Sequence, residues 1–265
     1  MKTVFIGAGK MATAIVRGII DNNVMNKEDI TAVDISEAAR NSFTGTTGVK
    51  ASELSHELLD SADIIILAVK PQYAEDASRA IAEQCSGKLI VSIAAGITLK
   101  SLSTWFNHQR IARAMPNTPL MVGCGASVFT VADGVSDEDR TIVSSIFSAS
   151  GIVYEVEEDA INAVTALSGS GPAYIFEMID AMTEAGKKCG LPEKLALTLT
   201  AQTVKGAGEM VLKEIGSPCE LRTAVTSPGG TTEAGLKVMD GENFRGLIDN
   251  VVQAAMKRSI ELGAK

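Results

Sequence analysis

The amino-terminal segment constrains the fold most strongly, because a short apolar run leads directly into a glycine-rich turn and then into a segment with helical periodicity. The segment reads Lys2-Thr-Val-Phe-Ile-Gly7-Ala-Gly9-Lys-Met-Ala12. In this G-x-G-x-x-A pattern, Gly7 permits a tight turn, Gly9 lets a diphosphate approach the backbone, and Ala12 lets the helix pack closely on the strand. A diphosphate there would bind the free N–H groups at the positive end of the helix. We therefore predict a dinucleotide-binding unit whose cofactor contacts are Ile6, Gly7, Ala8, Gly9, Lys10 and Met11.

A second apolar run, from Ile30 to Val33, ends in Asp34, about 20 residues after the turn, where such units place an acid. We expect Asp34 to accept hydrogen bonds from the ribose hydroxyls of the adenosine, where its charge would repel the 2'-phosphate of NADPH. Asp34 or Ser36 could instead cap the following helix. The sequence therefore leaves the choice between NADPH and NADH open.

The first half of the chain alternates short β-branched runs with stretches of helical periodicity, a pattern typical of βαβ units and of a parallel sheet buried on both faces. After Pro119 we expect two further strands with a helix between them that Ser136 caps. We therefore predict an α/β Rossmann domain with a mostly parallel sheet. The expected strands are 3–6, 30–33, 64–69, 89–93, 111–114, 126–130 and 152–156, and the expected helices are 11–21, 36–40 and beyond, 72–83 and 99–107.

Three more strand ends carry small or polar groups. In an open α/β sheet the ligand binds along the carboxyl ends of the strands, so we expect these loops to contact the cofactor. Lys70 is the only cation among them, and it is either a cofactor contact or a surface lysine before a turn. The predicted contacts are Ala68, Val69, Lys70, Pro71, Ala94, Ala95, Gly96 and Asn117.

The character of the sequence changes near residue 157. From Glu157 onward we find no convincing strand, only helical segments separated by glycine and proline. Pro172 and Gly190 flank one such segment in the manner that helix ends prefer, and others are expected over 193–214 and 243–262. We therefore predict a dinucleotide-binding domain over residues 1–156 and an all-α domain over residues 157–265.

Composition excludes several classes of partner. With 24 Lys+Arg against 32 Asp+Glu, the net charge of −8 has the wrong sign for binding nucleic acid or an anionic membrane surface. The chain has only 2 histidines and 4 scattered cysteines, which argues against a metal site or a disulfide framework. No apolar run approaches the roughly 18 to 20 residues of a membrane span, and the amino terminus does not resemble a signal peptide. We expect a cytoplasmic protein without nucleic-acid, membrane or metal partners.

One group of charges has no expected chemical role. Glu155, Glu157, Glu158 and Asp159 follow one another closely at the predicted domain border. Acids at a helix start usually remain in solvent and interact with the helix dipole. We interpret these four residues as solvated charges.

Two glycine-rich stretches stand out in the second half, each leading into a helix. They run from Leu167 to Tyr174 and from Val225 to Thr232. In the second, the backbone N–H groups of Gly229, Gly230, Thr231 and Thr232 could bind a carboxylate, and two threonine hydroxyls could bind a polar ring atom. Either stretch could instead be only a tight turn with a capped helix.

Taken together, the motifs closely resemble those of the pyrroline-5-carboxylate reductase family over nearly the whole chain. The most specific is the carboxyl-terminal signature from Pro218 through Ser227-Pro-Gly-Gly-Thr-Thr232 to Asp240. The others are Ile6-Gly-Ala-Gly9, Ala68-Val-Lys-Pro71, Ser92-Ile-Ala-Ala-Gly96, Arg113-Ala-Met-Pro-Asn-Thr-Pro119 and the stretch from Leu167 to Tyr174.

The resemblance implies an NAD(P)H-dependent oxidoreductase that reduces 1-pyrroline-5-carboxylate to L-proline, the last step of proline biosynthesis. It implies that two subunits dimerise through their helical domains and that the dimers often assemble further into decamers. It also implies that the substrate lies between the nicotinamide site of one subunit and helices of the dimer. The resemblance further implies that the N–H groups of Gly230 and Thr231 bind the substrate carboxylate. It implies that the Thr232 hydroxyl is the catalytic group and contacts the ring nitrogen. The implied substrate-binding residues are Ser227, Gly229, Gly230, Thr231 and Thr232. Family members that prefer NADPH commonly carry Ser, Thr, Asn or Arg where this chain has Asp34-Ile-Ser36.

Two other functions share part of this pattern. A β-hydroxyacid dehydrogenase also joins a Rossmann domain to a helical one, but it places a catalytic lysine on the helix after a glycine-rich turn. Here that helix starts at Pro172 and has no lysine until Lys187. A nucleotide-binding regulatory protein would share the first half of the sequence, but it has no evident need for the Ser227 to Thr232 loop.

Overall fold

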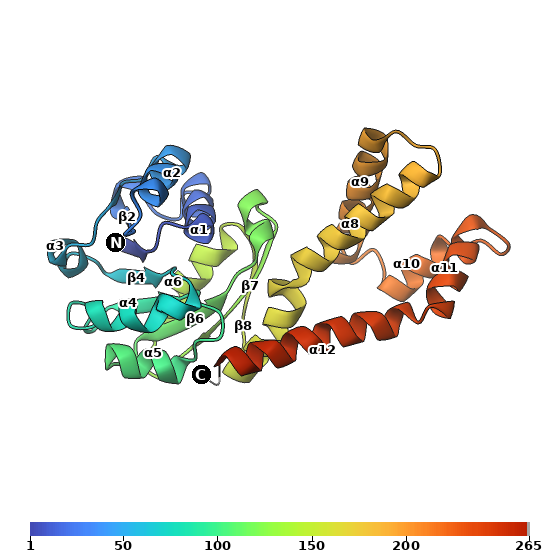
Figure 1. Cartoon of the computed structure of the whole chain (residues 1–265). Coiled ribbons are helices and arrows are strands. Elements are labelled where there is room, and N and C mark those ends of the chain that lie inside the picture. The colour runs from blue at the N-terminus through green and yellow to red at the C-terminus, as the bar shows by residue number, and fades with distance from the viewer. Residues whose placement is uncertain (264–265) are drawn as a thin grey trace. The chain divides into compact units, whose positions relative to one another are not determined.

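The computed structural model describes residues 1–263, which form two compact units (Figure 1). The first unit contains residues 1–170 together with the chain from residue 255, and the second contains residues 171–254. The predicted border at residue 157 lies just after the last strand, which ends at Glu155, whereas the compact units divide fourteen residues later, between Ser170 and Gly171.

The first unit is built around one sheet of eight strands in the order β3-β2-β1-β4-β5-β6-β7-β8. Neighbouring strands are parallel except β6 and β7, which are antiparallel. The order reverses between β1 and β4, which creates the switch point where ligands bind in such sheets. The strands are β1 (Thr3–Ile6), β2 (Ile30–Val33), β3 (Ala51–Ser52), β4 (Ile64–Leu67), β5 (Leu89–Ser92), β6 (Ile111–Met115), β7 (Gly125–Val131) and β8 (Gly151–Glu155).

Helices cover both faces of this sheet, as the continuous apolar runs of its central strands require. Strand β4 is the clearest case, because all four of its residues are buried. Alternate residues of the strands enter two separate apolar clusters, one containing Phe5 and Ile66 and the other containing Ile65 and Leu67. The helices of this unit are α1 (Lys10–Asp21), α2 (Glu37–Thr47), α3 (His56–Asp60), α4 (Ala74–Ile81), α5 (Leu99–Phe106), α6 (Asp137–Ser148) and α7 (Ile161–Val164).

The second unit is all-helical, as predicted from the sequence after residue 157. Its long helices α8 and α9 pack against each other, and the connection between them contains Gly190 with a φ of 95°. Helix α12 extends from this unit into the first one. The helices are α8 (Gly171–Lys188), α9 (Glu193–Leu212), α10 (Pro218–Ala224), α11 (Thr231–Gly241) and α12 (Phe244–Gly263).

Both apolar clusters are built from residues of the first unit. The second unit leaves many large apolar side chains exposed, including Phe176, Leu199, Leu212 and Val238. Within residues 1–263, no helix has the length and apolar character that crossing a bilayer requires.

Candidate active site

The glycine-rich turn after β1 has the backbone geometry that a dinucleotide site needs. Gly7 has a φ of 108°, a conformation that side chains disfavour. A methyl group on it would lie 2.7 Å from the carbonyl oxygen of Ala68, at the end of the neighbouring strand β4. The N–H of Gly7 donates to the carbonyl of Val33 at 2.7 Å, so the turn is fixed to the end of β2 as well. Gly7 is therefore required by the fold at the switch point of the sheet.

Gly9 serves a different purpose, because it keeps the start of α1 open. It is the N-cap of this helix, it provides no side-chain cap, and the first turn of the helix contains no acidic residue. A methyl group on Gly9 would meet nothing within 4 Å. The first N–H groups of the helix therefore face open space with a positive dipole end, which fits a diphosphate. Lys10 is exposed at this end, and Met11 is half-buried.

Asp34, at the end of β2, binds the glycine-rich turn directly. Its Oδ2 accepts the backbone N–H of Ala8 at 2.9 Å, and its Oδ1 accepts the N–H of Ser36 at 2.8 Å. Ser36 is the residue that caps α2, because its hydroxyl accepts the N–H of Ala39. The helix cap therefore belongs to Ser36, and the carboxylate of Asp34 stabilises the glycine-rich turn, while its contact with the ribose stays a prediction.

A further contact at this strand end could not be predicted from the sequence. Arg40 of α2 donates from Nη1 to the carbonyl oxygen of Asp34 at 2.7 Å. Its Nη2 lies 3.2 Å from Oε1 of Glu53, which follows β3. Arg40 is half-buried on α2, and its two acceptors lie at the end of β2 and after β3, so only the three-dimensional structure brings these residues together.

The two other predicted loops lie at the same edge of the sheet, since β4 and β5 run parallel to β1. After β4, Ala68 and Val69 are half-buried, and Lys70 is exposed beside Pro71. After β5, Ala94 is buried and Ala95 is half-buried. Gly96 has a φ of 78°, and a methyl group on it would lie 3.3 Å from Cβ of Leu262.

Asn117 follows β6, and its side chain holds backbone segments together. Its Oδ1 accepts the N–H of Ala126 at 2.9 Å, and its Nδ2 donates to the carbonyl of Ser168 at 3.0 Å. Ser168 belongs to a π-helical segment over Thr165–Gly169, a rare conformation that often occurs at functional sites. The predicted contact of Asn117 with a cofactor stays a prediction, and its amide already links this segment to β7.

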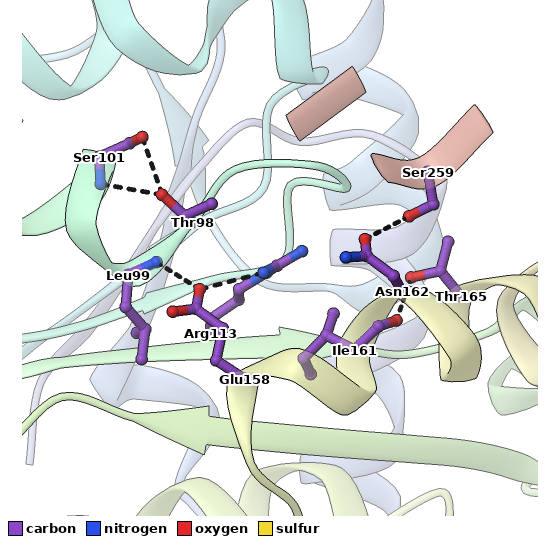
Figure 2. A network of polar contacts seen from close by, with 9 residues as sticks. All are labelled: Thr98, Leu99, Ser101, Arg113, Glu158, Ile161, Asn162, Thr165 and Ser259. Atoms are coloured by element: carbon purple, nitrogen blue, oxygen red, sulfur yellow. Dashed lines mark hydrogen bonds and ion pairs between the residues drawn. The ribbon is translucent and has the colours of Figure 1, made fainter. Parts of the chain in front are cut away.

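A partly buried ion pair connects the middle of β6 with the segment after β8 and the start of α5 (Figure 2). Arg113 of β6 has a side chain only 5% exposed, and its Nη1 lies 3.1 Å from Oε1 of Glu158. The same oxygen accepts the N–H of Leu99, the first residue of α5, at 2.7 Å. Burial lowers the pKa of Arg113, which the hydrogen bond to Glu158 partly offsets.

The interpretation of the acids near residue 157 as solvated charges is therefore wrong for Glu158, which is bound to Arg113 and to the start of α5. Glu155 is exposed and forms an ion pair with Arg140. The prediction failed because the partner of Glu158 lies 45 residues away in the sequence. Beside this pair, Asn162 accepts the hydroxyl hydrogen of Ser259 at 2.8 Å, which attaches the end of α12 to α7.

In the second unit, the loop from Ser227 to Gly230 joins α10 to α11. Gly229 has a φ of 72°, and the N–H of Gly230 donates to the carbonyl of Ser227 at 2.9 Å. Gly230 is the N-cap of α11 without a side-chain cap, and Thr231 and Thr232 are the first two residues of the helix. Their N–H groups belong to the first turn, which has no intrahelical acceptors for them.

Glu233 accepts a hydrogen bond from one of the backbone N–H groups that were predicted to bind the carboxylate, that of Gly229. Its Oε2 accepts the N–H of Gly229 at 2.6 Å, and its Oε1 lies 3.0 Å from the ammonium of Lys237. The hydrogen bond from Gly229, together with Lys237, lowers the pKa of Glu233. Within this loop, Thr231 and Thr232 therefore offer the N–H groups best placed to bind an anion.

Comparisons with known proteins agree with both halves of this description. A profile described as "Pyrroline-5-carboxylate reductase dimerisation" matches residues 158–262, and one described as "NADP oxidoreductase coenzyme F420-dependent" matches residues 2–96. A pyrroline-5-carboxylate reductase of Arabidopsis thaliana is 43% identical over 262 residues, which cover 98% of this chain and 95% of the relative. The chain belongs to the pyrroline-5-carboxylate reductase family.

Solved structures of this reductase family have the same fold over their whole length. The pyrroline carboxylate reductase of Plasmodium falciparum with NADP bound has a TM-score of 0.90 at 33% identity and covers 99% of this chain and 98% of its own. The pyrroline-5-carboxylate reductase of Coxiella burnetii also has a TM-score of 0.90, at 37% identity, with 98% of each chain covered. A Rossmann domain followed by a helical dimerisation domain is therefore the fold of this reductase-family chain.

Proposed function

We infer that the chain reduces 1-pyrroline-5-carboxylate to L-proline with NAD(P)H, the last step of proline biosynthesis. The observation that carries this inference is the 43% identity to a pyrroline-5-carboxylate reductase over 98% of the chain. An alignment of that extent includes both the dinucleotide turn and the loop of the helical unit. The proposal therefore rests on both halves of the chain together.

The first unit would hold the cofactor. The start of α1, which Gly9 keeps open, would bind the diphosphate of the cofactor. The loops after β2, β4 and β5 would contact the remaining parts of the cofactor. When bound, the reduced nicotinamide supplies the hydride for the imine carbon. The residues that we propose for this task are Ile6, Gly7, Ala8, Gly9, Lys10, Met11, Asp34, Ala68, Val69, Lys70, Pro71, Ala94, Ala95, Gly96 and Asn117.

The loop from Ser227 to Thr232 would hold the substrate carboxylate. The resemblance assigns this to the N–H groups of Gly230 and Thr231, but the N–H of Gly230 is already directed to Ser227 in a tight turn. Binding of the carboxylate through the N–H groups of Thr231 and Thr232 leaves that turn intact. The N–H of Gly230 could also contribute if it donated to the carboxylate and to the carbonyl of Ser227 at the same time. We propose that the positive end of α11 binds the anion and that Ser227 and Gly229 shape the loop around it.

The Thr232 hydroxyl would orient the ring nitrogen of the imine. No strong side-chain acid is needed there, because the imine is basic and water can supply its proton. Both histidines lie outside this loop, and burial lowers the pKa of His108 in the other unit. Thr232 therefore contributes by positioning the imine, and we expect a modest dependence of the rate on any one protein acid.

We propose that the chain acts in the cytoplasm as a homodimer that assembles further, for example into a decamer. The match of residues 158–262 to a dimerisation profile supports self-association. The exposed apolar side chains of the second unit give a physical reason, since patches of this kind on a helical surface are normally covered by a partner. Sedimentation analysis of the purified protein would determine the number of subunits.

The decisive experiment is a spectrophotometric assay of NADH and NADPH oxidation on addition of 1-pyrroline-5-carboxylate. A parallel assay supplies NAD or NADP with 3-hydroxyacids, the substrates of the rival dehydrogenases. We expect turnover only with the imine, since α8 carries no lysine before Lys187. Activity with 3-hydroxyacids alone would replace this proposal by the rival one.

A further inference from the structure

A second pair of opposite charges, Arg40 of α2 and Glu53 after β3, lies near the end of β2, and its arrangement bears on the choice between NADH and NADPH. The side chain of Arg40 is only 15% exposed, whereas that of Glu53 is 81% exposed. Arg40 donates from Nη1 to the backbone carbonyl of Asp34 and, through Nη2, contacts Glu53 at 3.2 Å. The arginine is therefore held at the strand end from two sides.

This position matters because the adenosine ribose of a dinucleotide binds at the end of the second strand in Rossmann folds. A nearby arginine is the group that normally accommodates the 2'-phosphate of NADPH, through a charge-assisted bidentate contact. Here Arg40 already has an acid as its partner. A 2'-phosphate at this strand end would also meet the carboxylates of Asp34 and Glu53.

Asp34 cannot turn away from the site without cost. Both of its oxygens accept backbone N–H groups, those of Ala8 and Ser36. Moving the carboxylate aside for a phosphate would therefore leave two backbone donors unpaired, and one of them lies in the cofactor turn. The negative charge is fixed where the ribose hydroxyls would be.

We propose that Glu53 is a specificity-determining residue that makes this reductase prefer NADH over NADPH. It does so by holding the Arg40 guanidinium against the carbonyl of Asp34 and neutralising the charge that a 2'-phosphate would need. Asp34 provides the repulsion, and Glu53 withholds the compensating cation. The inference rests on the proposed function only in requiring that a dinucleotide binds at the first unit.

The test measures binding rather than turnover. Calorimetric titration of the purified protein gives the dissociation constants for NADH and NADPH, and for the fragments ADP-ribose and 2'-phospho-ADP-ribose, which lack the nicotinamide. In the unchanged protein we expect the 2'-phosphorylated form to bind at least about fivefold more weakly in both pairs. In Glu53→Gln, NADPH should bind about fivefold more tightly, with NADH changed less than about twofold.

Two further variants and a change of salt concentration separate specificity from a general change of charge. In the double variant Glu53→Gln/Arg40→Gln the gain for NADPH should disappear, because the released cation is gone. Glu57→Gln removes the same charge from an exposed acid of α3 and should leave the NADPH to NADH ratio unchanged. Raising the salt concentration should shrink the gain in Glu53→Gln, since it is electrostatic.

Several results would overturn the proposal. These are equal or tighter binding of NADPH in the unchanged protein, an unaltered ratio in Glu53→Gln, or the same gain in Glu57→Gln. With any of these outcomes, oxidation of either cofactor by 1-pyrroline-5-carboxylate would still uphold the proposed function. Failure to bind either dinucleotide would contradict both proposals at once.

Discussion

The carboxylate of Asp34 accepts the backbone N–H of Ala8 across 2.9 Å, so the acid at the end of β2 is a structural part of the glycine-rich turn. The same side chain can also accept from the ribose hydroxyls, because a carboxylate has about four acceptor sites and the two backbone bonds leave some of them free. Cofactor choice and the stability of the turn are therefore coupled at one residue.

This coupling predicts a divided effect of Asp34→Ser. The ratio of catalytic efficiency with NADPH to that with NADH should rise, because the repulsive charge is gone. The affinity for NADH itself should fall, because a serine hydroxyl cannot reach both Ala8 and Ser36. Steady-state kinetics with each cofactor would measure both effects, and an unchanged ratio would mean that the carboxylate does not face the ribose.

The two glycines of the turn should respond to alanine in opposite ways. Gly7→Ala should destabilise the protein by at least about 2 kcal/mol, since it combines a positive φ with a clash against Ala68. Gly9→Ala should leave the stability nearly unchanged, because its methyl group enters open space. It should nevertheless weaken NADH binding by about tenfold or more, since that space is the proposed diphosphate site.

Chemical denaturation and cofactor titration of the two variants separate these effects. Gly45→Ala is a suitable control, because a methyl group there also meets nothing within 4 Å, in the last turn of α2. It should leave the affinity unchanged and raise the stability by about 1 kcal/mol or less, the difference in helix propensity between glycine and alanine. Normal NADH affinity in Gly9→Ala would exclude the start of α1 as the diphosphate site.

The buried guanidinium of Arg113 should depend on Glu158 for its contribution to the stability of the protein. Glu158→Ala leaves the guanidinium buried without its acid and should cost about 3 kcal/mol of unfolding free energy. The double variant Glu158→Ala/Arg113→Met removes the stranded charge and should recover much of that loss. Urea denaturation measures both, and additive losses in the double variant would show that the two side chains do not interact.

Removal of the Thr232 hydroxyl should reduce turnover without changing the affinity for the cofactor. Thr232→Ala should lower kcat about tenfold or more, the size of effect that one oriented polar contact to a transition state contributes. Thr231→Ala is the matched control, because it retains the backbone N–H proposed to bind the carboxylate, and Thr232→Ser should restore most of the rate. Unchanged turnover in Thr232→Ala would remove this hydroxyl from the mechanism.

Most of the first unit could be predicted because its signals are local. Runs such as Ile64 to Leu67 are short, apolar and rich in β-branched residues, and all seven expected strands occur within a residue or two of their predicted limits. The two-residue strand β3 was missed because two residues have no periodicity. The antiparallel direction of β7 could not be predicted either, since strand direction depends on the path of the chain after Pro119.

The site was predictable in its outline and not in its contacts. Glycine patterns located the turn at Gly7 and the loop at Gly229, where the backbone conformations do need glycine. The roles of Glu158, Arg40 and Glu233 were missed, because each acts through a partner that only the fold or a helical turn places beside it. The sequence around a charged residue does not show which atom its side chain will contact in the folded protein.

Reduction of a cyclic imine by this chain is tested most directly by measuring the oxidation of NADH and NADPH by the purified protein with 1-pyrroline-5-carboxylate. We expect turnover that depends on the imine, is faster with NADH, and yields proline in equal amount to the cofactor oxidised. Absence of imine-dependent oxidation with both cofactors, in protein that binds them, would contradict the proposed function.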